Sequence, residues 1–452
     1  MLNYNDLKEL ARKCKFVQRS SSKIEGPDFV ELLTTAIIDN PFVSLDGLCD
    51  ILTQINPNAN ITPQGLAERI NSDQAVDYLK NVLQISIKKN LESIKDNDSI
   101  KLFASFKRVF LEDSTQCELN KKLADNFKGS GGSASKSSLK INLIYELIQD
   151  VIQDIYITDN KEPDQALAGI ILDHLQSNDL IIRDLGYFSL KTLINFPGIN
   201  AFFLSRLIKS VNVYLSEQDD VAIDDIGGYF FKKFSDQTII DIDVFLGQKE
   251  KFPCRLIIYR LPENVVNERV RKARKAAKKK GRALTKEYIN WLHFGFYITN
   301  VSRDIWSAEV IGTIYRIRWR IELIFKSWKT LLRIDVLKGT RPERIRCFLY
   351  GRLITITIMT MLYAYASWYA EIKHKREVSA HKLFNWLMRK ERLEKAIYSD
   401  SMNLLMITLK QDMLRNCKQK RKRKTSLELI AGKVPYMESF DQNNLILLGI
   451  SN

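Results

Sequence analysis

Two acidic residues end apolar runs that have the composition of buried strands. Asp113 closes the run RVFLED, and Asp184 closes LIIRD just before Gly186. A carboxylate at the end of a buried strand is costly unless it is paired or binds a metal ion. A third acid, Glu322, lies among basic residues in the stretch YRIRWRIELIFKSWK, residues 315–329. These three carboxylates are candidate ligands of one metal site.

Oxygen ligands without His or Cys indicate Mg²⁺ or Mn²⁺ rather than zinc. Three carboxylates brought together would repel each other unless a divalent cation neutralised them. Two such ions about 4 Å apart activate a water and stabilise the leaving oxygen of a phosphodiester. We therefore expect two Mg²⁺ (or Mn²⁺) ions. The six cysteines form no CxxC pair and the four histidines are scattered, so the sequence predicts neither a zinc site nor a disulfide framework.

The stretch around Glu322 has helical periodicity. On one continuous helix, the side chains of Tyr315, Arg318, Glu322 and Lys329 fall in a stripe about 60° wide, beside an apolar face rich in isoleucine. The helix would pack its isoleucines into a core and present one carboxylate among Tyr, Arg and Lys. An ordinary ion pair between Glu322 and Lys326 is the alternative explanation of this acid.

Net charge points to a polyanionic partner. Lys and Arg number 69 against 53 Asp and Glu, which gives +16, and nucleic acid is the commonest partner of so basic a chain. Ribosomal-like and membrane-surface proteins are basic too. The run RVRKARKAAKKKGR holds nine basic residues and no acid, so we expect phosphate binding there rather than a merely solvated helix face. The candidate contacts in this run are Arg269, Arg271, Lys272, Arg274 and Lys275.

The longest uncharged run, Leu353–Ala370, has 18 residues, which just reaches the length needed to span a bilayer. Because it contains Thr, Ser and Tyr and is closely bounded by Arg352 and Glu371, it predicts a buried core helix instead. The polar N-terminal start carries no signal peptide, and we expect a cytoplasmic protein without a membrane partner.

The predicted secondary structure changes near residue 103, from helices alone to strands separated by helices. Before it, SLDGLCDILTQI, TPQGLAERI and SDQAVDYLKNVL predict helices, the second capped by Thr62. These helices suit a DNA-binding head, or three-helix packing with no such role. After it, FKRVFLEDST, LKINLIYELI and DLIIRDLGYF predict strands separated by helical segments, as in an α/β sheet of mixed order. The pieces GGYFFKKF, TIIDIDVFLG and PCRLIIYRL within 216–291 also look strand-like.

The spacing Tyr315-x2-Arg318-x3-Glu322-x6-Lys329 is similar to the YREK signature of bacterial insertion-sequence transposases of family four, a DDE class. The context resembles that family as well, with Asp113-Ser-Thr at the first acid and Asp184-x-Gly-Tyr at the second. Two further features, Arg206 and the pair Thr299-Asn300, look like the family. The resemblance covers roughly residues 100–370.

This resemblance implies an RNase H-like catalytic core with a β-rich insertion, flanked by helical N-terminal and C-terminal regions. The expected segments are a DNA-binding region (1–102), a first core segment (103–215), the insertion (216–291), a second core segment (292–370) and a helical region that is a candidate for dimerisation (371–452). Asp113, Asp184 and Glu322 would be the DDE triad that holds the metal. Tyr315, Arg318 and Lys329 would contact phosphates at the transposon end. Trp291 is a candidate for stacking a flipped base, Phe294 fits as well, and both are also explained as core aromatics.

The implied activity is that of a DNA transposase, which binds the terminal inverted repeats of its element, cuts at the ends and joins 3′-hydroxyls to target DNA. Its partner would be double-stranded DNA, its synaptic form a homodimer, and its location the nucleoid of a bacterial cytoplasm. Two alternatives stay open at this point. One is an RNase H-like nuclease without strand transfer, and the other is a catalytically inactive DNA-binding repressor.

Overall fold

The apolar runs of the sequence pair as the strands of a mixed sheet. The computed structural model describes residues 2–19, 23–40, 42–92, 103–130, 135–233 and 236–418. Nine strands follow in the order β3-β2-β1-β4-β5-β9-β8-β7-β6. The strands are β1 Arg108–Glu118, β2 Ser138–Glu146, β3 Val151–Asp159, β4 Asp179–Arg183, β5 Phe202–Arg206, β6 Val213–Tyr214, β7 Ile239–Leu246, β8 Phe252–Arg260 and β9 Phe294–Thr299.

Strand directions match the expected core. β1, β4 and β5 run parallel, β2 and β3 form an antiparallel pair, and β9, β8, β7 and β6 continue antiparallel beyond β5. All nine residues of β2 and all five of β4 are buried, as in strands covered on both faces. The order β3-β2-β1-β4-β5 confirms the predicted RNase H-like arrangement within an α/β fold.

The chain divides into two compact units. Unit 1 is assembled from Met1–Asn97, Ser114–Glu162 and Ile321–Lys420, and unit 2 chiefly from Asp98–Asp113 and Pro163–Arg320. The five-segment division stays a prediction. The chain beyond residue 418 lies outside the described residues, and with it most of a second basic stretch, CKQKRKRK at 417–424.

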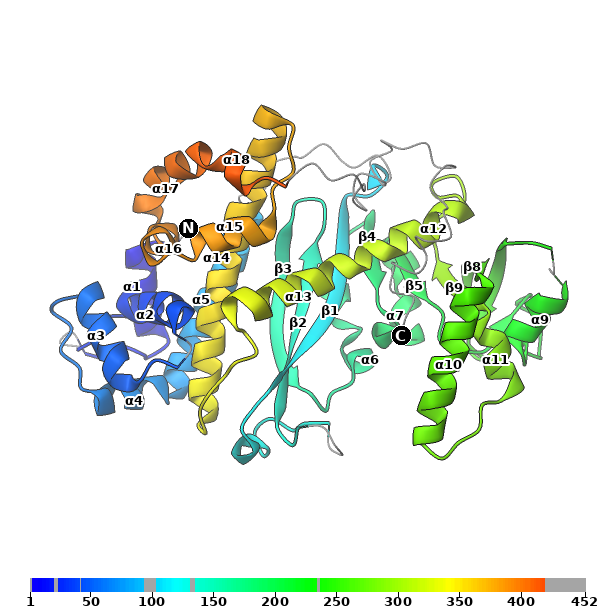
Figure 1. Cartoon of the computed structure of the whole chain (residues 1–452), viewed down its shortest axis with the longest axis horizontal. Helices are drawn as coiled ribbons and strands as arrows, with labels where there is room; N and C mark the ends of the chain where they lie inside the picture. The colour runs from blue at the N-terminus through cyan, green and yellow to red at the C-terminus, as the bar shows by residue number, and fades with distance from the viewer. Residues whose placement is uncertain are drawn as a thin grey trace. The chain divides into compact units, whose positions relative to one another are not determined.

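Unit 1 is mainly helical, as predicted for both ends of the chain (Figure 1). Thr62 accepts a hydrogen bond from the Gly65 N–H at 3.1 Å, which confirms the predicted cap. The helices of unit 1 are α1 Tyr4–Lys13, α2 Gly26–Asp39, α3 Leu45–Ile55, α4 Pro63–Ile70, α5 Asp73–Glu92, nearly all of α13 Trp319–Leu332, α14 Pro342–His374, α15 Ala380–Leu387, α16 Lys390–Ile397, α17 Ser399–Gln411 and α18 Met413–Asn416.

The helix α14 is the core of unit 1. Among the described residues it is the one helix long and apolar enough to cross a membrane, yet 78% of its most apolar window is buried inside the protein. It runs beside α5 (Figure 1) and packs closely on α2, where a side chain at Gly351 would come within 2.5 Å of the Leu33 carbonyl oxygen. Thr355 donates to the Thr34 carbonyl at 3.0 Å. The prediction of a core helix therefore agrees with the packing.

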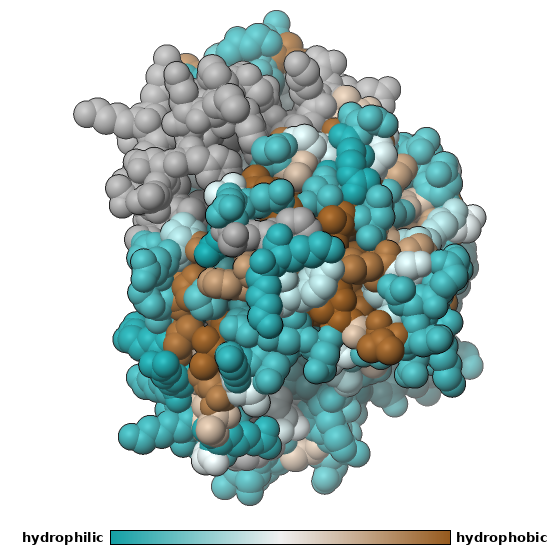
Figure 2. Space-filling view, turned by 90° about the vertical axis from the view of Figure 1, so that its right-hand side faces the viewer, coloured by the Kyte–Doolittle hydropathy of each residue, from teal (hydrophilic) through white to brown (hydrophobic). Residues whose placement is uncertain are grey.

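In unit 2, one segment predicted to be a strand is a helix. The first seven residues of GGYFFKKF belong to α9 (Ile226–Lys233), whereas TIIDIDVFLG and PCRLIIYRL form β7 and β8 as expected. A side chain at Gly227 would lie 2.5 Å from the backbone of Asn290 and Trp291, so this glycine lets α9 pack directly on α11. The further helices of unit 2 are α6 Asp164–Leu167, α7 Leu190–Leu193, α8 Phe196–Ile199, α10 Glu263–Lys279, α11 Lys286–Leu292 and α12 Ala308–Tyr315. Figure 2 looks onto the end of the molecule that carries α9–α11, and its surface is largely hydrophilic with separate apolar patches.

Candidate active site

Parallel pairing brings the two aspartates of unit 2 together. The last register pair between β1 and β4 is Glu112 with Arg183, and Asp113 and Asp184 follow directly. Asp184 ends its strand as predicted and precedes a 3₁₀ turn, Leu185–Tyr187. Asp113 does not end its strand, because β1 continues to Glu118. The Asp113 side chain is 18% exposed and that of Asp184 39%.

Arg318 lies between these two carboxylates. Its Nη1 is 3.3 Å from Oδ2 of Asp113, and its Nε is 3.5 Å from Oδ1 of Asp184. Tyr315 donates a hydrogen bond to the same Asp184 oxygen at 3.4 Å. Two residues of the predicted signature thus meet two of the predicted catalytic acids, and the guanidinium offsets their mutual repulsion.

The signature does not lie on one continuous helix, which corrects the predicted stripe. α12 ends at Tyr315, the 3₁₀ turn η5 spans Arg316–Arg318, and α13 begins at Trp319. A 3₁₀ turn advances about 120° per residue instead of about 100°, so three such residues turn the following helix by roughly 60°. Glu322 is exposed in the first turn of α13 and belongs to unit 1.

Lys329, the last residue of the signature, also belongs to unit 1. Its Nζ donates to the Gln116 carbonyl oxygen at 3.3 Å, which ties α13 to the second half of β1. The expected apolar face of the helix is confirmed, because Ile321, Phe325 and Trp328 are buried.

Tyr315 is held as a neutral hydrogen-bond donor. It is 7% exposed and packs against Tyr297, with ring centroids 5.1 Å apart. Burial, followed by the neighbouring charge of Asp184, raises the pKa of Tyr315 above its ordinary value. Its hydroxyl therefore stays protonated at neutral pH and can donate to a carboxylate or a phosphate.

A buried ion pair directly precedes the aspartates and was not predicted from the sequence. Arg183 Nη2 lies 2.7 Å from Oε2 of Glu112, and both side chains are almost completely buried. Arg183 also donates to the Ala168 carbonyl at 2.6 Å. Burial raises the pKa of Glu112, while the charge of Arg183 opposes that shift. Because successive residues of a strand point to opposite faces, this pair locks the register that brings Asp113 and Asp184 side by side.

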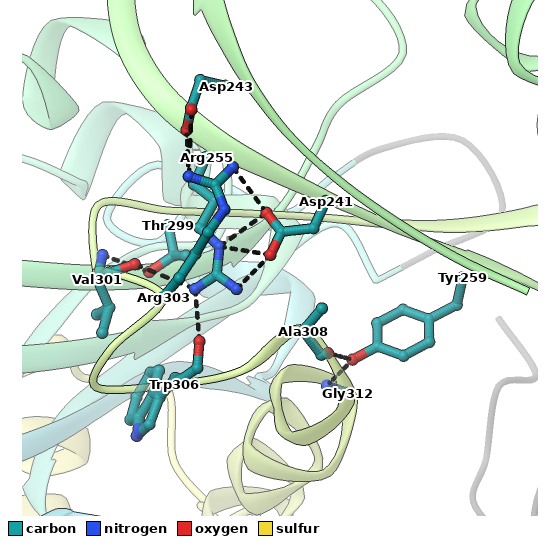
Figure 3. Close-up of polar contacts among 10 residues, drawn as sticks. All are labelled: Asp241, Asp243, Arg255, Tyr259, Thr299, Val301, Arg303, Trp306, Ala308 and Gly312. Atoms are coloured by element: carbon teal, nitrogen blue, oxygen red, sulfur yellow. Dashed lines mark hydrogen bonds and ion pairs between the residues drawn. The ribbon is translucent and has the colours of Figure 1, made fainter.

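A second polar network holds the segment that leads into α12 (Figure 3). Arg255, buried on β8, pairs with Asp241 at 2.5 Å and donates to the carbonyl of Trp306 at 2.6 Å. The Tyr259 hydroxyl donates to the Ala308 carbonyl and accepts from the Gly312 N–H at 2.9 Å. It therefore fastens the first turn of α12, the helix that ends at Tyr315, to β8.

The other family-like residues are structural in unit 2. Asn300 accepts from the Phe203 N–H at 2.9 Å and donates to the Ala201 carbonyl at 2.8 Å. Thr299 donates to the Phe203 carbonyl at 2.5 Å. This pair fastens the end of β9 to β5. The positive charge of Arg206 helps to lower the pKa of Arg269 and opposes the rise in the pKa of Tyr315.

The predicted basic run forms the exposed face of α10, with one exception. Arg271, Lys272, Arg274 and Lys275 are exposed. Lys272 pairs at 3.1 Å with Glu268, an acid just before the run, so the run is not wholly without acidic partners.

Arg269 is the exception, because it turns inward. It donates to the carbonyls of Leu292 and Phe294 at 3.2 and 2.9 Å, and burial lowers its pKa to about 10. Its guanidinium anchors α10 to the start of β9. Trp291 is half-buried and stacks on Phe296, with ring centroids 4.1 Å apart and an interplanar angle of 22°.

The donor set of unit 2 fits a hard cation. Two carboxylates converge on one positive group, Arg318, and carboxylate oxygen is the ligand that Mg²⁺ and Mn²⁺ prefer. Within the described part of the chain, no cluster of three or more His, Cys, Asp or Glu side chains is poised to hold a metal ion.

Paired aspartates on neighbouring parallel strands of an RNase H-like sheet, followed by an acidic residue on a helix, define the DDE class of enzymes that cleave DNA and transfer its strands. A family model described as "Transposase DDE domain" matches residues 104–358, more than half of the chain. The chain belongs to this family of insertion-sequence transposases, and the resemblance predicted from its YREK-like spacing is confirmed.

Curated relatives are similar over most of their length. The "Transposase for insertion sequence element IS231B" of Bacillus thuringiensis subsp. berliner is 31% identical over 398 residues, which are 83% of this chain and 80% of that protein. The "Transposase for insertion sequence element IS1151" of Clostridium perfringens is 29% identical over 405 residues, 85% of this chain and 83% of that protein. A solved piggyBac transposase synaptic complex with hairpin DNA covers 93% of this chain and 83% of that one. It has a TM-score of 0.45 and 11% identity, a likeness too distant to support an argument about residues.

Proposed function

We propose that this transposase binds the terminal inverted repeats of its own insertion sequence, cuts the DNA at those ends and joins the freed 3′-hydroxyls to target DNA. Asp113, Asp184 and Glu322 would hold two Mg²⁺ (or Mn²⁺) ions as the catalytic triad. When bound, such ions supply an activated oxygen nucleophile and neutralise charge on the leaving oxygen of a phosphodiester. The observation that carries the proposal is the convergence of Asp113 and Asp184 on Arg318 of the signature.

Arg318 and Tyr315 would exchange one anionic partner for another. Both side chains contact carboxylate oxygens of the aspartates. A phosphate of the transposon end offers the same oxygen acceptors, and a guanidinium binds phosphate in bidentate fashion. Lys329 would add a third contact from the same signature. These residues would orient the scissile strand, which is the main contribution a protein makes to phosphoryl transfer.

The exposed cations of α10, Arg271, Lys272, Arg274 and Lys275, would contact DNA phosphates outside the cut site. Arg269 would support them indirectly by fixing the helix to β9. Trp291 remains a candidate for stacking an unpaired base, although its contact with Phe296 also explains it as a core aromatic. A homodimer would bring two transposon ends together in the bacterial nucleoid.

Glu322→Gln tests the triad directly. Removing one ligand charge while keeping the size of the side chain should lower Mg²⁺-dependent cleavage of end-containing DNA by at least about 100-fold, with binding of the duplex retained. The matched control is Glu118→Gln, an exposed glutamate at the end of β1. Undiminished cleavage by Glu322→Gln would refute the assignment. Joining of labelled ends to a plasmid separates a transposase from a nuclease, and metal-independent binding with no cleavage by the wild-type chain would identify a repressor.

A further inference from the structure

Unit 1 contains a basic pocket that the proposed catalytic site does not use. Its volume is about 600 Å³. Three cationic side chains line it and no carboxylate does. The lining residues are Asn71, Asn120, Leu337, Lys338, Gly339, Thr340, Arg341 and Arg344.

Three separate segments build this pocket. Asn71 follows the last residue of α4, and Asn120 lies two residues after β1. Residues 337–344 run from the loop after α13 into the first turn of α14. Figure 1 shows α4 beside the beginning of α14. Gly339 has φ +140°, a conformation that favours glycine and turns the chain into the helix. The pocket therefore depends on the folded unit and is not a loose cluster of basic residues.

The beginning of α14 contributes the partial positive charge of a helix N-terminus, and Glu343 is the one acid in this first turn. This helix has 33 residues, Pro342 lies in its first turn, and its N-cap residue Arg341 makes no side-chain capping hydrogen bond. The first N–H groups of a long helix carry partial positive charge and bind anions. Lys338 and Arg341 are exposed beside it, and Arg344 is half-buried.

The three cations are not neutralised by any carboxylate among the described residues. Within the described ranges, none of them has an ion-pair partner. Arg344 Nε donates to Oδ1 of Asn71 at 3.1 Å, and Lys338 Nζ lies 3.6 Å from the ring centre of Phe42, which is exposed. Burial, and then repulsion from Arg341, lowers the pKa of Arg344. An anion in the pocket would relieve this repulsion.

We propose that this pocket binds a backbone phosphodiester of DNA, as a contact additional to the carboxylate site. Its lining offers Lys, Arg, Asn and Thr donors and no acid, and its volume exceeds what a lone phosphate needs. Phosphate contacts position a protein on DNA but carry no direct sequence information. The inference rests on the proposed action on DNA. The phosphate comes either from the transposon end or from target DNA.

The test measures binding of two fluorescent duplexes of equal length, one with the terminal sequence of the element and one unrelated, over a range of salt concentrations. Lys338→Ala combined with Arg341→Ala should weaken binding on the order of tenfold and reduce the dependence of log affinity on log salt by about one to two. The single variant Arg341→Lys, which keeps the positive charge, should retain most of the wild-type affinity. Lys80→Ala, an exposed lysine of α5 outside the pocket, is the control and should have little effect.

The outcomes separate the two sources and the two proposals. Weaker binding of the terminal duplex alone assigns the pocket to the transposon end, and equal loss on both assigns it to any DNA. Unchanged affinity and salt dependence of the double variant, with a wild-type chain that binds DNA, would overturn the pocket and leave the proposed function standing. A wild-type chain that binds neither duplex contradicts both. Both substituted side chains are exposed, so an unchanged thermal midpoint should confirm that the variant is folded.

Discussion

At the scale of single residues, the position of Arg318 has the clearest consequence. Two neighbouring carboxylates repel each other, and a cationic side chain between them can offset that repulsion. Arg318 contacts both Asp113 and Asp184 and can do so. In the proposed metal site the arginine and the metal would compete for the same oxygens, so removing the arginine should favour metal binding.

Arg318→Ala should make the protein respond more strongly to Mg²⁺. We expect saturating Mg²⁺ to raise the thermal midpoint of the variant by about 2 °C more than that of the wild-type chain, which corresponds to roughly 1 kcal/mol. Cleavage should nevertheless fall, because the phosphate contact is lost. Arg320→Ala is the neighbouring control, and adding Asp113→Asn to Arg318→Ala should abolish the extra response. Equal Mg²⁺ responses in wild type and Arg318→Ala would contradict the competition.

Some of this residue-level picture was predictable. Asp113 and Asp184 each follow an apolar run, and pairing of these runs as parallel neighbours brings the two residues together, although β1 continues past Asp113 to Glu118. The bridging arginine was not predictable, because its reach depends on the 3₁₀ turn. The Glu112–Arg183 pair did leave a signal, since residues of opposite charge stand directly before the two aspartates in LED and IRD.

At the scale of elements, strands were predicted better than the helix that carries the signature. Helical periodicity continues through Arg316–Arg318, and no proline or glycine there marks the 3₁₀ break. GGYFFKKF was misassigned because a short aromatic run does not distinguish a strand from a helix, and its two glycines permit close helix packing instead. The position of α12 depends on contacts from β8 that no local pattern reveals.

Tyr259→Phe tests how β8 positions α12. Losing the hydroxyl removes two contacts that fasten α12 to β8, those with the Ala308 carbonyl and the Gly312 N–H, so α12 and Tyr315 at its end would be held less firmly. We expect cleavage to fall by about tenfold, with duplex binding unchanged and stability reduced by about 1 kcal/mol. Tyr229→Phe, whose hydroxyl meets only Lys233 among the hydrogen bonds described for it, is the control. If the two variants cleave DNA equally fast, Tyr259 has no positioning role.

At the scale of the whole molecule, charge and burial act on different properties. The excess of basic residues, +16 overall, favours the association of the chain with polyanionic DNA. Its stability depends on the apolar core and on a few titratable groups that folding removes from water. Glu31 on α2 is one of these groups. Burial, opposed by a hydrogen bond from Tyr398, raises its pKa to about 7.

The contribution of Glu31 to the stability of the protein should therefore fall as pH rises from about 4.5 to about 7. A carboxyl with a raised pKa binds its proton more tightly in the folded state than in the unfolded state. Its favourable contribution is complete below the unfolded pKa and is lost as pH passes the folded pKa. Relative to Glu31→Gln, the wild-type chain should lose on the order of 2 kcal/mol between pH 4.5 and 7.5, because each pKa unit corresponds to about 1.4 kcal/mol. Thermal unfolding at these pH values measures the difference, with Glu9→Gln, an exposed glutamate paired with Lys13, as the control. If Glu31→Gln shows the same pH dependence as wild type, Glu31 is not the group responsible.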